Sequence, residues 1–187
     1  MNFCSACGEK VSLQIPLGDN RHRYVCDACE TIHYENPKIV TGCIPEWAGT
    51  ILLCKRAIEP RYGLWTLPAG FMENSETNMQ GAARETSEEA NASVENMTLF
   101  CVFSIAHINQ VYTMYRGDLV GGEASPGEES LETALMSEAE IPWQEIAFQV
   151  ISETLKLYFR DLAAGRFNTH YGDIVKQPDG SFIVNYY

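Results

Sequence analysis

The sequence has few basic residues and no long apolar run. Lysine and arginine together number 13 against 25 aspartates and glutamates, which gives a formal net charge of -12. This charge repels the phosphate backbone of a long nucleic acid, so we expect no DNA or RNA polymer as a partner. No run of about 18 apolar residues is present, and the start, Met1-Asn2-Phe3-Cys4, lacks the charged and then apolar pattern of a leader. We therefore expect a cytoplasmic protein without a membrane partner.

Hydrophobic residues make up 45% of the 187 residues, which is enough for one medium domain with a small appendage. The appendage is the first 35 residues, which contain few aliphatic side chains and many turn formers. Apolar, strand-like segments begin at Lys38. The acidity also favours a metal site, because a small phosphate ester can approach carboxylates when cations lie between them.

Four of the seven cysteines form two Cys-x-x-Cys pairs within the appendage: Cys4, Cys7, Cys26 and Cys29. Two thiolates on each of two tight turns suit a tetrahedral cation, and zinc is the natural ion for four sulfur ligands. Because the appendage lacks a core, a structural zinc would supply much of its folding free energy. Two redox-active cysteine pairs are the competing interpretation.

The other three cysteines, Cys43, Cys54 and Cys101, stand singly in apolar stretches. An odd total argues against the disulfide framework of a secreted protein. We therefore interpret these three as small buried side chains in strands. His22 and His33 are expected at the surface or in packing contacts, since four cysteines already complete the coordination shell.

Periodicity and turn signals predict a mixed domain of strands and two helices. The expected elements are a hairpin within 39–54, a short strand at 64–67, a helix between Thr77 and Asn91, strands within 94–119 around a turn at Asn109, a short strand at 133–136, a helix opened by Pro142 and ended by Gly165, and a hairpin around 178–184. Thr77 with Gln80 fits a capping box at the start of the first helix.

The first predicted helix contains three carboxylates, Glu85, Glu88 and Glu89, in a stretch of five residues. At about 3.6 residues per turn, spacings of three and four let all three side chains face one point, where they repel one another. No lysine or arginine follows any of them at the i+4 position. Divalent cations would relieve the repulsion, and oxygen ligands suit magnesium or manganese. A solvated acidic helix face is the alternative.

The spacing of these residues resembles the Nudix box. Its pattern is glycine, five residues, glutamate, seven residues and then Arg-Glu-x-x-Glu-Glu, and this chain matches it with Gly70, Glu76, Arg84, Glu85, Glu88 and Glu89. Two positions depart, since Thr86 replaces an apolar residue and Asn91 replaces the terminal glycine. Neither departure removes a carboxylate, and asparagine tolerates the left-handed turn that ends such a helix.

The resemblance covers roughly residues 38–165, including Gly63-x-Trp65-x-Leu67-Pro68-Ala69-Gly70 before the box and Ile141-Pro142-Trp143 after it. The paired cysteines resemble the zinc-ribbon leader of the NADH and FAD pyrophosphatase branch. The resemblance implies an α+β fold, a Nudix-type α/β/α sandwich with a mixed sheet, preceded by a small zinc ribbon. The expected domains are a zinc ribbon at 1–35, a Nudix domain at 36–165 and a hairpin-like tail at 166–187.

By this resemblance, Glu85 and Glu89 are the main magnesium or manganese ligands. Glu88 and the backbone carbonyl of Ala69 complete the site, while Arg84 orients a box carboxylate and Glu76 braces it. The implied reaction is attack of a metal-activated water on a diphosphate phosphorus. The general base is a helix glutamate or a loop acid. Our loop candidates are Glu129 first, then Glu128 and Glu123.

The expected substrate is a small nucleoside diphosphate derivative. NADH pyrophosphatases carry a Ser-Gln-Pro-Trp-Pro-Phe-Pro element after the box, which is absent here, so FAD and ADP-ribose rank ahead of NADH. Phe71 and Tyr112 are candidates for stacking on the substrate, and the segment 107–112 lines the nucleotide pocket or only packs a turn. We expect a homodimer. The alternative function is a catalytically weak nucleotide sensor whose zinc ribbon binds a partner.

Overall fold

The computed structural model describes residues 1–187, which form two compact units, Met1–Pro37 and Lys38–Tyr187. The first unit is a three-stranded antiparallel sheet in the order β1-β2-β3, with bounds Val11–Gln14, Arg23–Cys26 and Ile32–His33. Its only buried apolar side chains are those of Cys4 and Cys26. As the sequence predicts, this unit has no hydrophobic core of its own.

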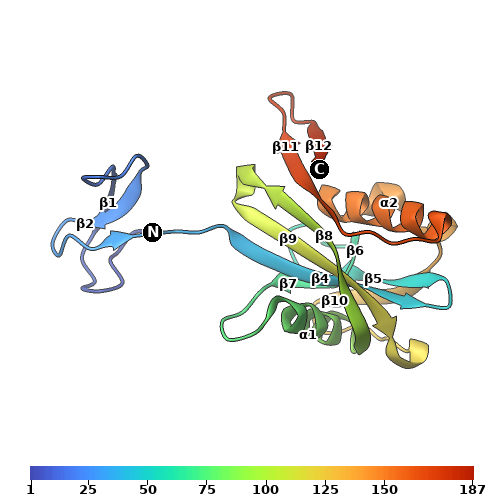
Figure 1. Cartoon of the computed structure of the whole chain (residues 1–187). Coiled ribbons are helices and arrows are strands. Elements are labelled where there is room, and N and C mark those ends of the chain that lie inside the picture. Colours follow the sequence, from blue (N-terminus) through green and yellow to red (C-terminus); the bar gives the residue numbers. More distant parts are fainter. The chain divides into compact units, whose positions relative to one another are not determined.

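The second unit is built on one nine-stranded mixed sheet (Figure 1). Its strands are β4 (Lys38–Trp47), β5 (Thr50–Arg56), β6 (Trp65–Thr66), β7 (Ala69–Phe71), β8 (Val94–Ile105), β9 (Gln110–Leu119), β10 (Ser130–Met136), β11 (His170–Lys176) and β12 (Phe182–Tyr186). Seven of them follow the order β10-β5-β4-β9-β8-β11-β12, while β6 pairs with β5 and β7 pairs with β4.

Parallel pairing of β4 with β9 forms the middle of the sheet, from Lys38 opposite Gln110 to Glu46 opposite Asp118. The predicted hairpin of β4 and β5 and the turn at Asn109 between β8 and β9 are both confirmed. Near its start, β4 also pairs with β7, which brings Gly70 opposite Thr41. This pairing fixes the loop that leads into the first helix.

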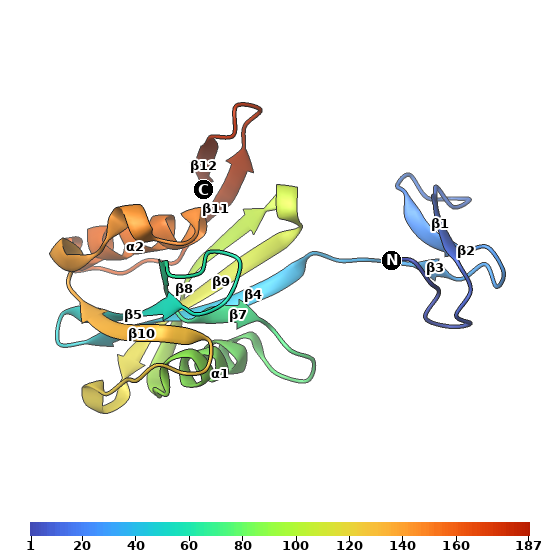
Figure 2. The same ribbon diagram turned by 180° about the vertical axis from the view of Figure 1, so that it is seen from behind.

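Helices α1 (Asn78–Ala90) and α2 (Gln149–Ala164) cover opposite faces of the sheet (Figures 1 and 2). Alternation along the strands shows why, because neighbouring side chains of a strand point to opposite faces. Ile44 and Met114 pack in the larger core with α2, whereas their neighbours Cys43 and Tyr115 pack with Ala82 of α1. The predicted α/β/α sandwich with a mixed sheet is confirmed.

Both helices end as predicted, but α2 begins later than predicted. Asn91 and Gly165 end them in the left-handed conformation, and Thr77 with Gln80 forms the capping box of α1. Pro142 opens only a 3-10 turn, Trp143–Glu145. The reason is that the following residues pair alongside β6, with Ile146 in a parallel bridge to Trp65 and the Ala147 amide bonded to the Trp65 carbonyl.

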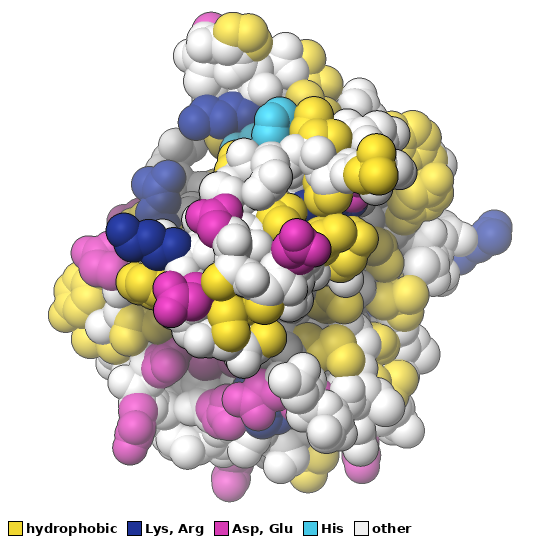
Figure 3. All heavy atoms as spheres, turned by 90° about the vertical axis from the view of Figure 1, so that its left-hand side faces the viewer, with side chains coloured by type: hydrophobic (Ala, Val, Ile, Leu, Met, Phe, Trp, Pro, Cys, Tyr) yellow, Lys and Arg dark blue, Asp and Glu magenta, His cyan; other side chains and the backbone are white.

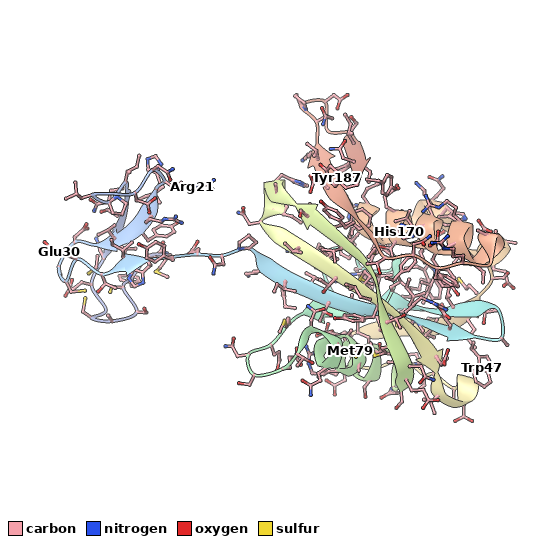
Figure 4. All side chains as sticks on the ribbon, in the orientation of Figure 1. Arg21, Glu30, Trp47, Met79, His170 and Tyr187 are labelled. Carbon is pink, nitrogen blue, oxygen red and sulfur yellow. The ribbon has the colours of Figure 1, made fainter.

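The C-terminal segment extends the sheet rather than lying apart from it. Strand β11 pairs in parallel with β8, and β12 returns antiparallel to β11 as the predicted hairpin. His170 at the start of β11 faces α2, as Figure 4 shows, and its Nε2 atom lies 2.7 Å from Asp161 Oδ2. The three single cysteines are buried in β4, β5 and β8, as expected. No helix is long and apolar enough to cross a bilayer.

Candidate active site and metal centre

Helix α1 presents its carboxylates to a cleft of about 1150 Å³ in the second unit. Glu85 and Glu89 are almost buried, with 9% and 5% of their surface exposed, whereas the Glu88 side chain is mainly exposed. Eight of the residues predicted for the diphosphate chemistry line this cleft: Ala69, Phe71, Arg84, Glu85, Glu88, Glu89, Tyr112 and Glu129. Glu128 also lines it, but Glu123 does not.

Arg84 connects the carboxylates of the helix to the loop before it. Its Nε and Nη2 atoms donate to the two oxygens of Glu76 at 3.0 and 2.9 Å. Nη1 donates to Glu85 at 2.8 Å and to Glu88 at 2.7 Å, and Nη2 also donates to the Phe71 carbonyl at 3.2 Å. Charge-assisted bonds of this kind fix the rotamers of their acceptors. Glu88 therefore has a cationic partner four residues before it, although no basic residue follows it at the i+4 position.

The electrostatics differ sharply between Glu76 and the two buried acids. Hydrogen bonds from Arg84 hold the pKa of Glu76 at about 2. Burial raises the pKa of Glu85 despite its bond to Arg84. Burial, reinforced by the charge of Glu85, raises the pKa of Glu89 to about 8. Ionising both Glu85 and Glu89 is therefore unfavourable when no cation lies beside them.

Gly70 lets the approach strand come close to the helix. A Cβ atom at this position would collide with the carboxylate of Glu85, so a side chain here would displace the acid. The backbone of the neighbouring Ala69 partly offsets the rise that burial causes in the pKa of Glu89. Strand β7 and helix α1 thereby bring the backbone of residues 69–70 against the two buried carboxylates.

The loop after β9 closes the other side of the cleft. The Ser125 amide donates to the Ala90 carbonyl at 2.8 Å, and the Gly127 amide donates to the Glu89 carbonyl at 3.0 Å. Glu129 follows in this loop, and its charge acts on both Glu85 and Glu89. The loop acid and the helix acids therefore face the same space.

The four cysteines of the first unit converge as predicted. Their sulfur atoms all lie within 4.8 Å of one another, with Cys4 and Cys29 at 3.7 Å and Cys7 and Cys26 at 3.4 Å. Four sulfurs around a zinc ion at about 2.3 Å lie about 3.8 Å apart, so the cluster fits a tetrahedral metal. Hydrogen bonds from Thr31 lower the pKa of the Cys29 thiol to about 6, which favours a thiolate.

Comparison with known proteins agrees with this geometry. Residues 2–35 match the zinc-ribbon family described as Nudix N-terminal, and residues 37–115 match the NUDIX domain family. A crystal structure of a NUDIX hydrolase from Nitrosomonas europaea is 56% identical, with a TM-score of 0.90 over 93% of this chain and 99% of that one. The chain belongs to the Nudix hydrolase family.

Curated Nudix relatives are more distant. The NAD-capped RNA hydrolase NudC of Photobacterium profundum is 32% identical over 165 residues, which are 83% of this chain and 59% of that protein. The ADP-ribose pyrophosphatase of Methanocaldococcus jannaschii is 29% identical over 115 residues, 58% of this chain and 67% of that protein. The chain thus spans about three-fifths of the length of this NudC relative.

The Nudix cleft also contains a cation that the sequence did not reveal. Arg56, at the end of β5, is 9% exposed, and its Nε donates to the Pro60 carbonyl at 2.9 Å. Its guanidinium lies 5.2 Å from the centre of the Phe148 ring and forms no ion pair. The two positive residues Lys55 and Arg56 at the end of an apolar strand were the available signal. The structure makes it an anion-binding candidate within the cleft.

The carboxylates fit the divalent metal that Nudix hydrolases use. Glu89 Oε2 is buried and has no hydrogen-bond partner, although buried polar atoms are almost always paired. The Glu85 carboxylate beside it faces the same cleft, and the Glu129 charge acts on both. The three carboxylates supply oxygen ligands, which suit a hard cation. We conclude that the residues present fit the metal.

Proposed function

We propose that this Nudix hydrolase cleaves the diphosphate bond of a small nucleoside diphosphate derivative, with magnesium or manganese at the α1 carboxylates. The observation that carries this proposal is the unpartnered, buried Glu89 oxygen in a cleft shared with Glu85 and Glu129. Glu85 and Glu89 would hold the cation, with Glu88 and the Ala69 carbonyl at its periphery. A cation held there supplies positive charge that neutralises the diphosphate oxygens and activates the attacking water.

In the proposed reaction, the water oxygen attacks one phosphorus of the diphosphate. The bond from that phosphorus to the bridging oxygen breaks, and the leaving phosphate keeps the electron pair. Glu129 accepts the proton of the water as general base. Glu128 is also exposed in the same cleft, but the electrostatic effect of Glu129 on Glu85 and Glu89 supports Glu129 for this role.

The remaining cleft residues would bind the substrate. Arg56 is a buried guanidinium without a carboxylate partner, so we assign it to a substrate phosphate. Phe71 is 48% exposed at the rim, with Lys38 Nζ 4.9 Å from its ring centre, and we assign it to stacking on the base. Tyr112 is buried with its side chain in the cleft and would contact the ribose or base.

Substrate identity rests on indirect arguments. The cleft of about 1150 Å³ exceeds the range of roughly 300 to 1000 Å³ common for small-molecule pockets, which supports a substrate with two nucleotide-like halves. Absence of the NADH pyrophosphatase element keeps FAD and ADP-ribose ahead of NADH. ADP-ribose and NAD-capped RNA must be tested as substrates, because the curated relatives are named for acting on them.

Charge argues for small substrates over a long RNA chain. The net charge is -12, and Figure 3 shows acidic, basic and hydrophobic side chains intermixed on the face that it presents. A net negative charge of this size repels a long phosphate backbone. We therefore propose that no polymeric nucleic acid is needed for turnover.

The deciding experiment is a substrate panel with and without magnesium: FAD, ADP-ribose, NADH, NAD-capped RNA and nucleoside triphosphates. We expect magnesium-dependent release of a mononucleotide, with FAD or ADP-ribose giving the highest kcat/KM. Binding across the panel without any turnover would refute the hydrolase proposal and favour a nucleotide sensor. A higher kcat/KM on NAD-capped RNA than on FAD or ADP-ribose would refute the proposed small substrate. It would favour instead the substrate for which the NudC relatives are named.

We also propose that zinc occupies the cysteine cluster in a structural role. Four thiolates complete its coordination shell, which leaves no open position for a substrate. His33 packs beside the cluster, with its Nε2 atom 3.3 Å from Cys4 Sγ. A homodimer stays a prediction, and sedimentation at several protein concentrations tests it.

A further inference from the structure

Asn91 joins the end of helix α1 to the loop that carries Glu128 and Glu129. Its backbone has φ 47° and ψ 37°, the left-handed conformation that ends the helix. Its side-chain Nδ2 atom donates to the Ser125 carbonyl at 3.3 Å and to the Pro126 carbonyl at 2.9 Å. A glycine could make the same turn but has no amide to donate. Asn91 therefore adds a tether that a glycine at this position would lack.

The backbone of the same loop lies directly on the last turn of α1. Ser125 and Gly127 donate their amides to the Ala90 and Glu89 carbonyls, which the helix itself leaves free at its end. Gly127 permits this approach, because a Cβ atom there would collide with the carbonyl oxygen of Glu88. The loop is thus attached to the same residues that carry the buried carboxylates.

The other end of the loop is fixed to the sheet. The Ala57 amide donates to the Glu129 carbonyl at 2.8 Å, and Ser130 begins strand β10. The carboxylate of Glu129 is exposed and accepts no hydrogen bond from any protein group. Its place in the cleft therefore depends on the backbone of the loop between these two attachments.

We propose that Asn91 is a positioning residue that holds Glu129 at the site of the attacking water. This inference rests on the proposed function, since it assigns a role to the residue that fixes the proposed base. The Nudix pattern has glycine here, so the asparagine converts a simple helix end into an anchor for the catalytic loop. Small displacements of a base lower turnover more than binding, because proton transfer requires contact with the water.

Asn91→Gly is the direct test, because glycine keeps the left-handed turn and removes only the amide. We expect kcat to fall about tenfold, as a misplaced catalytic group loses rate steeply, while KM and manganese affinity stay within about twofold. Asn96→Gly is the matched control, since Asn96 also has positive φ and donates its side-chain amide, to Asp118 at 2.9 Å, away from the cleft. It should keep wild-type kcat.

Two further measurements separate positioning from general loosening. Hydrogen exchange at the Ser125 and Gly127 amides should accelerate in Asn91→Gly and stay unchanged in Asn96→Gly. In a Glu129→Gln background, which is itself slow, Asn91→Gly should cost no additional factor in kcat, because both changes remove the same function.

Wild-type kcat in Asn91→Gly would overturn the positioning role while leaving the hydrolase proposal intact. The same holds if Asn91→Gly lowers kcat by an equal factor in the wild-type and Glu129→Gln backgrounds. Unimpaired turnover in Glu129→Gln would overturn it as well. A wild-type chain that turns over nothing in the substrate panel would instead remove the proposed function, and the positioning role with it.

Discussion

The guanidinium of Arg84 holds Glu76 with two parallel hydrogen bonds although the residues are eight positions apart. Glu76 lies just before α1, and it also accepts the Glu73 amide at 2.7 Å. The third guanidinium nitrogen, Nη1, donates to Glu85 and Glu88 on the helix. One side chain thereby fixes the loop before the helix and the carboxylates that face the cleft.

Arg84→Lys should lower turnover by about 10- to 100-fold, the range expected when a residue supporting metal ligands is lost. A lysine keeps the charge but offers no planar fork, so it cannot bind both oxygens of Glu76 and also bridge Glu85 to Glu88. Steady-state kinetics and manganese titration measure the effect. Arg166→Lys, at an exposed arginine without a side-chain partner, is the control. Equal activity in both variants would show that the fork of Arg84 is dispensable.

Glu89→Gln should cut turnover at least about a hundredfold, the lower end for loss of a base or metal ligand. The substitution keeps the shape of the side chain and removes one negative charge from the cleft. Its circular dichroism spectrum should match the wild type. Glu95→Gln, an exposed acid on β8, serves as the control and should retain full activity. Wild-type rates in Glu89→Gln would exclude this acid from the metal site.

Each chain should contain one zinc ion, measured by elemental analysis. Removing it by chelation, or substituting Cys26→Ser, should unfold Met1–Pro37 because no apolar side chains other than two cysteines are buried there. Metal binding supplies on the order of 10 kcal/mol to such modules. Hydrogen exchange should then rise within this unit while residues 38–187 stay protected. A folded first unit with reactive thiols and no zinc would contradict the assignment.

Asp161→Asn should destabilise the second unit by about 2 kcal/mol at pH 7, the scale of hydrogen bonds to a charged group. Asp161 is 3% exposed, and its Oδ2 atom accepts the Asn168 amide at 3.0 Å and lies 2.7 Å from His170 Nε2. Burial alone would raise the pKa of Asp161, but hydrogen bonds from Asn168 and His170 outweigh it and hold the pKa below its usual value.

Because the folded pKa of Asp161 is lowered, its stabilisation is complete above the unfolded pKa of about 4. It is lost as the pH falls through the folded value. Urea unfolding should therefore show a large stability gap between wild type and Asp161→Asn at pH 7 and a clearly smaller gap at pH 3. Asp173→Asn, which removes an exposed contact to the Tyr187 hydroxyl, should have little effect at either pH. A gap between wild type and Asp161→Asn that is as large at pH 3 as at pH 7 would assign the stabilisation to another source.

Local signals predicted most of the elements correctly. Thr77 with Gln80, Asn91 and Gly165 marked helix ends because capping and left-handed turns depend on residues next to one another. Pro142 was misleading for the opposite reason. A parallel bridge from Ile146 to Trp65, some eighty positions earlier, keeps the chain extended where local preference favours a helix.

Sequence alone determined which residues the proposed chemistry uses: four cysteines in two close pairs, and carboxylates spaced for one face of a helix. Both depend on short spacings that a turn or a helix converts directly into geometry. Only the tertiary structure decided which other residues lie in the cleft with the helix carboxylates. Arg56 and Glu129 reach the cleft from β5 and the loop before β10, and the free oxygen of Glu89 exists because distant strands bury it. Burial, and the meeting of residues that are far apart in the sequence, depend on tertiary packing. Packing of this kind cannot be inferred from the spacing of residues along the chain.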